Sequence, residues 1–183
     1  KKINKFSANI ETEDKLNGKI EFKEISWTKK EFDQLLKVGA GLNSNELAEV
    51  FTQWNKAELN SYLIEITSEI LAFKDTDGSP LVEKMLDTAG QKGTGKWTVI
   101  NSQELAMPVT LISEAVYARC VSALKDERVI ASKAIKGPKP NISGKKEKLI
   151  QNIHDALYAS KLVSYAQGYM LMQAAAKEYG WKL

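Results

Sequence analysis

The run from Lys145 to Tyr179 constrains the fold most, because it carries a helical pattern without a single proline. Gly180 follows this run and fits the glycine that commonly ends a helix. A helix this long in a chain of 183 residues is expected to place part of its apolar face against a partner chain or another domain. Apolar and small residues recur at helical spacing at Leu149, Ile153, Ala156, Leu157, Ser160, Val163, Gln167, Met170 and Ala174.

Helical spacing also recurs in the chain from about Leu47 onward, and no convincing alternation of the kind that marks a strand is present. One apolar face is predicted from Leu47 to Trp54, with Ser44 as the N-cap, and a second stripe follows over residues 59–73. Residues 109–135 read as one long helix or two in tandem. We therefore predict an all-α fold. Residues 45–183 form the helical domain, and residues 1–44 form a separate N-terminal segment that is partly helical or disordered.

Composition excludes several classes of site. One cysteine and one histidine, Cys120 and His154, make a disulfide framework impossible and a metal site improbable. A net charge of +3 is too small to argue for nucleic acid, and no apolar run is long enough to cross a membrane. The expected setting is cytoplasmic, with neither nucleic acid nor membrane as a partner.

The stretch AGQKGTGKWT, residues 89–98, has the glycines and lysines of a phosphate site. Gly90, Gly95 and Lys96 fit most of a nucleotide P-loop, but Trp97 stands where that motif needs a hydroxyl to hold magnesium. The residues just before it, LVEKMLDTA, look helical, whereas a P-loop or a dinucleotide fingerprint follows a strand. We reject both motifs. An anion site built from exposed backbone N–H groups and lysines, and a plain glycine turn before a helix, both stay open.

Four stretches resemble the 6-phosphogluconate dehydrogenase (decarboxylating) family, and the resemblance extends from about Leu47 to Leu183. They are WNKAELNSYLIEITSEIL, AGQKGTGKWTVIN, PVTLISEAVYARCVSALKDERVIASKAIKGP and ALYASKLVSYAQGYMLMQAAAKEYGWKL. The resemblance implies the long-helix C-terminal domain of such an enzyme, without the Rossmann domain. It also implies a homodimer that oxidises 6-phosphogluconate with NADP to ribulose 5-phosphate, a step of the pentose phosphate pathway. The complete enzyme would bind NADP, and this chain alone would bind no cofactor.

The resemblance also implies which residues hold the phosphate end of 6-phosphogluconate. Carried onto this sequence, they are Lys92, Thr94 and Arg119. The residue types suit a phosphate, because a guanidinium can make two parallel hydrogen bonds, an ammonium adds charge and a hydroxyl adds a donor.

The N-terminal segment departs from the family's pattern. The family's catalytic helix can be laid on KLNGKIEFKEIS only with Lys19 as an insertion, which makes Glu21 a weak candidate for the catalytic acid. No lysine matches the catalytic base, so this chain alone is expected to be inactive. The alternative is a non-catalytic helical module that pairs with a full-length enzyme.

Overall fold

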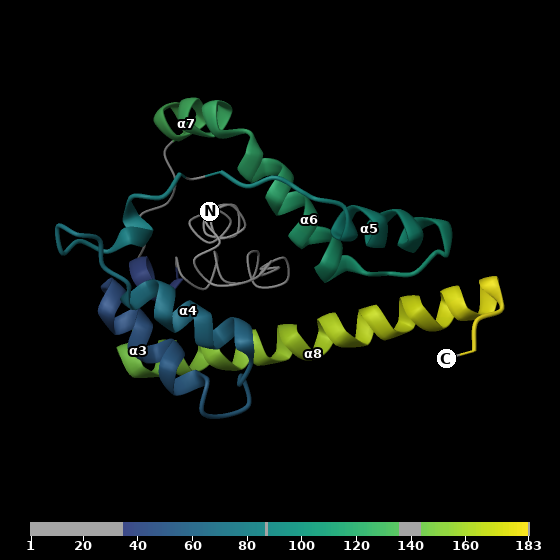
Figure 1. The fold of residues 1–183 in the computed structure, drawn as a ribbon, viewed down its shortest axis with the longest axis horizontal. Helices are drawn as coiled ribbons and strands as arrows, with labels where there is room; N and C mark the ends of the chain where they lie inside the picture. The colour runs from purple at the N-terminus through teal and green to yellow at the C-terminus, as the bar shows by residue number, and fades with distance from the viewer. Residues whose placement is uncertain (1–34, 87, 136–143, 183) are drawn as a thin grey trace.

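The computed structural model describes residues 35–86, 88–135 and 144–182, and these residues form helices joined by turns and loops (Figure 1). Apart from an isolated bridge between Lys74 and Pro80, they contain no strand, which confirms the all-α prediction for this part of the chain. In order, the elements are η1 Leu35–Gly39, α3 Ser44–Trp54, α4 Tyr62–Ala72, η2 Leu81–Glu83, α5 Thr94–Glu104, α6 Thr110–Ala123, α7 Lys125–Ala134 and α8 Lys146–Tyr179.

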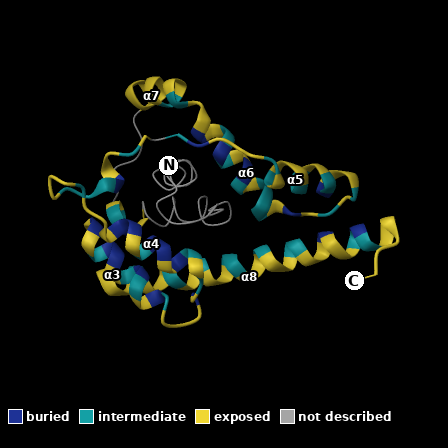
Figure 2. Ribbon diagram, viewed as in Figure 1, coloured by how far each residue is buried: buried dark blue, intermediate teal, exposed yellow. Residues whose placement is uncertain are grey.

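Helix α8 runs almost as predicted and extends along most of the length of the described structure (Figure 1). It ends at Gly180, whose φ of 68° is the left-handed conformation that favours glycine, and whose N–H bonds the Ala176 carbonyl. Exposed residues cover much of its C-terminal half (Figure 2). No helix among the described residues is long and apolar enough to cross a membrane.

The main core lies where α3 and α4 pack on the first turns of α8. Phe51 and Trp54 contact each other with ring centroids 5.0 Å apart, and Ile153 of α8 is buried in the same cluster. Helix α3 begins with a capping box, in which the Asn43 side chain and the Glu46 carboxylate each bond the other's backbone N–H. The predicted N-cap, Ser44, was therefore wrong by one residue. The buried cluster consists of Leu36, Leu42, Leu47, Ala48, Phe51, Trp54, Leu59, Ile64, Leu71 and Ile153.

The stripe predicted over residues 59–73 is only partly the buried face. Tyr62 and Phe73 are exposed, whereas Ile64 and Leu71 are buried. The difference arises because α4 meets two clusters: Ile64 faces the main core, and Ile70 packs in a second cluster with Ile66 and Val82. A helix in contact on two sides buries residues outside a single stripe.

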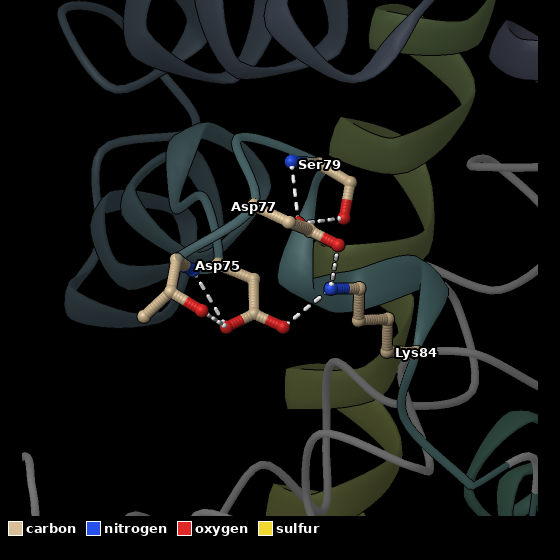
Figure 3. A network of polar contacts seen from close by, with 5 residues as sticks. Asp75, Asp77, Ser79 and Lys84 are labelled. Carbon is tan, nitrogen blue, oxygen red and sulfur yellow. Dashed lines mark hydrogen bonds and ion pairs between the residues drawn. The ribbon is translucent and has the colours of Figure 1, made fainter.

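A compact turn follows α4 and is held by Lys84 (Figure 3). The Lys84 ammonium lies 2.5 Å from an Asp75 carboxylate oxygen and 2.6 Å from one of Asp77, while Asp77 also accepts from the hydroxyl and backbone N–H of Ser79. These hydrogen bonds hold the pKa of Asp75 and that of Asp77 below the usual aspartate range.

The segment LVEKMLDTA was predicted to be helical, and this prediction is wrong for its described residues. Only one 3₁₀ turn, η2, forms there, and the described residues beyond it lead to the glycine stretch without a helix. Lys84, which follows η2, bonds Asp75 and Asp77 of the preceding turn.

The segment predicted as one helix or two is two. Helix α6 ends at Ala123, its C-cap Leu124 has a ψ of 62°, and α7 follows with no buried residue. Arg128 of α7 donates from Nη2 to the Ser122 carbonyl near the end of α6, at 2.9 Å.

Candidate anion-binding site

The glycine stretch leads directly into α5, and two of its positions favour glycine, one for its backbone conformation and one for its packing. Gly93 precedes the first helical residue with a φ of 147°, a conformation that L-residues rarely adopt. Gly95 lies against α6, where an added Cβ would come within 2.9 Å of Val116 Cγ2. These glycines set the path of the loop and the close approach of α5 to α6.

Arg119 projects from α6 onto this loop, although 29 residues separate it from its partner. Its Nε donates to the Gly90 carbonyl at 2.8 Å, and its Nη2 donates to the same oxygen. The side chain is well buried, since Arg119 as a whole is only 7% exposed. The structure therefore brings the predicted arginine to the loop that carries Lys92 and Thr94.

Two further contacts hold the loop against α6. The Gln91 side-chain amide lies 2.8 Å from the Cys120 sulfur, and the Thr88 hydroxyl donates to the Ser122 carbonyl at 3.3 Å. Cys120 is partly exposed, and its sulfur lies beside the polar Gln91 amide. Together with Arg119, these side chains fix the loop along the second half of α6.

Lys92, Thr94 and Arg119 line one cavity of about 760 Å³. The loop and α6 form one wall, and α4 together with the middle of α8 forms the other. The α8 wall contributes Ser160, Lys161, Ser164, Tyr165 and Tyr169.

The charged residues in the described lining of the cavity are all positive. Its described lining includes four cations, Lys92, Lys96, Arg119 and Lys161, and no aspartate or glutamate. Because an arginine and lysines that converge without a carboxylate attract and pair with anions, the cavity suits an anionic ligand. The N-terminus of α5, which has no acidic residue in its first turn, adds to the same field.

Sequence reasoning missed Lys161, which lines the cavity and whose ammonium lies 3.4 Å from the Asn60 carbonyl. Helical spacing identified this part of α8 only as a packing surface, and it gives no signal of which polar side chain faces a distant loop.

Glu21, the predicted catalytic acid, lies outside the described residues. Within the described ranges, no group of three His, Cys, Asp or Glu side chains could hold a metal ion.

The family model for the C-terminal domain of 6-phosphogluconate dehydrogenase matches residues 17–183. The decarboxylating 6-phosphogluconate dehydrogenase of Schizosaccharomyces pombe is 59% identical over 149 residues, covering 81% of this chain and 30% of its own length. The enzyme of that name from Cunninghamella elegans is 61% identical over 151 residues, covering 82% of this chain and 31% of its own.

A solved structure of the Plasmodium falciparum 6-phosphogluconate dehydrogenase superposes with a TM-score of 0.83 at 36% sequence identity. The match covers 90% of this chain and 36% of that one. That protein is described in its apo form, with its cofactor NADP+ and with its substrate 6-phosphogluconate. The chain thus spans about 30% of the length of these two curated relatives.

Proposed function

Because the chain belongs to the 6-phosphogluconate dehydrogenase family, we propose that it forms the helical part of such an enzyme and binds the phosphate end of 6-phosphogluconate. The complete enzyme would oxidise this sugar acid with NADP and decarboxylate it to ribulose 5-phosphate. This chain would bind and orient the substrate for that reaction.

The observation that carries the proposal is the position of Arg119. Its buried guanidinium is bonded to the Gly90 carbonyl, so the positive charge and the loop with Lys92 and Thr94 form one preorganised unit. A phosphate in the cavity would meet the guanidinium, the Lys92 ammonium and the Thr94 hydroxyl, because all three residues line it.

NADP is assigned to no residue of this chain. A dinucleotide is held where a strand leads through a glycine turn into a helix, and none of the described residues before Gly93 forms a strand.

The proposal is tested by titrating the ¹⁵N-labelled chain with 6-phosphogluconate and following its amide resonances. We expect weak binding, with a Kd of about 1 mM, because a phosphate held by a few charge-assisted bonds provides about 4 kcal/mol. The shifted amides should lie in residues 90–96 and beside Arg119. Gluconate, which lacks the phosphate, is the control and should shift none of them. Equal shifts with gluconate, or no shift at these residues, would refute the proposal.

We also propose that the chain forms a homodimer through the exposed side of α8. Exposed apolar side chains on a long helix favour a partner chain, because a monomer in water rarely leaves a large apolar patch uncovered. Figure 2 shows exposed residues along α8, and the exposed apolar side chains that do not line the cavity include Tyr158, Leu162, Val163 and Met170.

Sedimentation velocity tests the dimer directly. We expect the mass of two chains, with dissociation on dilution. A single-chain mass at every concentration would contradict a homodimer. A monomer that binds a full-length 6-phosphogluconate dehydrogenase would instead favour the alternative function, a non-catalytic module that pairs with the enzyme.

A further inference from the structure

The first turn of α6 is capped by a residue from a different helix. Its N-cap, Val109, makes no side-chain hydrogen bond, so this end has no cap from its own segment. Gln167 of α8 provides one instead: its Oε1 accepts from the Leu111 backbone N–H at 3.0 Å. Its Nε2 donates to the Thr110 hydroxyl at 2.9 Å.

These two bonds join the opposite walls of the cavity. Thr110 and Leu111 begin the helix that carries Arg119, and Gln167 lies on the α8 wall between the cavity residues Ser164 and Gly168. Arg119 follows Leu111 by eight residues, or about 12 Å along the helix axis. A fixed α6 N-terminus therefore limits where the guanidinium can lie relative to α8.

The other contacts of α6 described above do not set this distance. Gly95 packs on Val116, and Arg119 bonds Gly90, but both glycines belong to the loop and α5, which lie on the same wall as α6. Those contacts would be preserved if the whole wall moved away from α8, whereas the Gln167 bonds would break.

We propose that Gln167 is a positioning residue that caps α6 from α8 and thereby fixes Arg119 opposite the α8 wall of the cavity. The capping role stands on geometry alone. Its consequence for phosphate binding rests on the proposed function.

Amide hydrogen exchange in the ligand-free chain tests the capping role. Gln167→Met keeps the length of the side chain but removes both bonds. The Leu111 amide should then exchange roughly fivefold faster, the factor that corresponds to a typical cap of about 1 kcal/mol. Gln167→Glu should restore slow exchange, because a carboxylate can accept from the Leu111 N–H and from the Thr110 hydroxyl and also suits a helix N-terminus. Gln173→Met makes the same change at an exposed position of α8 and serves as the control.

The second measurement is the 6-phosphogluconate titration described above. Gln167→Met should weaken the apparent affinity severalfold and Gln173→Met should leave it unchanged. Gln167→Glu should restore the affinity in part, because its carboxylate restores the cap but also repels an anion in the cavity. A Leu111 amide that exchanges equally slowly in Gln167→Met, or as fast in Gln167→Glu as in Gln167→Met, overturns the capping role. Normal affinity in Gln167→Met overturns the positioning role. If the unmodified chain binds no 6-phosphogluconate, the proposed function fails, and the exchange data still decide whether Gln167 caps α6.

Discussion

The Arg119→Met variant is expected to lose about 2 kcal/mol of unfolding free energy and at least about tenfold in affinity for 6-phosphogluconate. The first loss follows because the guanidinium bonds to the Gly90 carbonyl disappear, and hydrogen bonds from charged groups contribute about 1.5–3 kcal/mol. The second follows because the cavity loses its buried cation. Urea denaturation and the amide titration measure the two effects separately.

Two controls distinguish the site from general stability. Arg119→Lys keeps the charge but not the planar donor set, so it should retain part of the affinity while losing the link to Gly90. Arg128→Met removes another arginine that bonds a carbonyl of α6 but does not line the cavity. It should lower stability and leave the titration unchanged. Normal affinity in Arg119→Met would remove the basis of the phosphate site.

The second large effect is expected in the main core. Phe51→Ala should reduce the unfolding free energy by about 3–5 kcal/mol, because Phe51 is 1% exposed and its removal leaves a cavity beside Trp54. Phe73→Ala is the matched control, since Phe73 is 59% exposed at the end of α4, and the same substitution there should change stability little. Denaturant unfolding followed by tryptophan fluorescence gives both values. Equal losses for the two variants would contradict the assignment of the core.

The sequence predicted best the helices whose apolar residues recur at regular helical spacing. Helix α8 is recognised because its apolar spacing persists to Gly180, and α3 because its face from Leu47 to Trp54 packs on one side only. The misplaced N-cap shows the limit of this reasoning, because Asn43 and Ser44 are both good caps and only the carboxylate of Glu46 selects between them. At LVEKMLDTA the residue types favour a helix, but only the 3₁₀ turn η2 forms, and Lys84 bonds the preceding turn, a contact that local pattern does not indicate.

Three residues of the candidate site were predicted from the family resemblance, whereas their distant contacts were not predicted. Family resemblance supplied Lys92, Thr94 and Arg119, and helix packing brings all three to one cavity; their binding of phosphate stays a prediction. Gln167 was predicted only as one of the regularly spaced residues on the packing face of α8. Its hydrogen bonds span 56 and 57 residues, and local pattern carries no information about such partners.

The continuity of α8 has a consequence for how this sequence can change. Ile153 anchors the helix in the core and Gln167 contacts α6, with uninterrupted helix between them. Inserting or deleting one residue in that interval would turn every later side chain by about 100° and shift it by about 1.5 Å. Length variation should therefore be poorly tolerated between these two residues, whereas single substitutions on the outer side of the same interval leave the register intact.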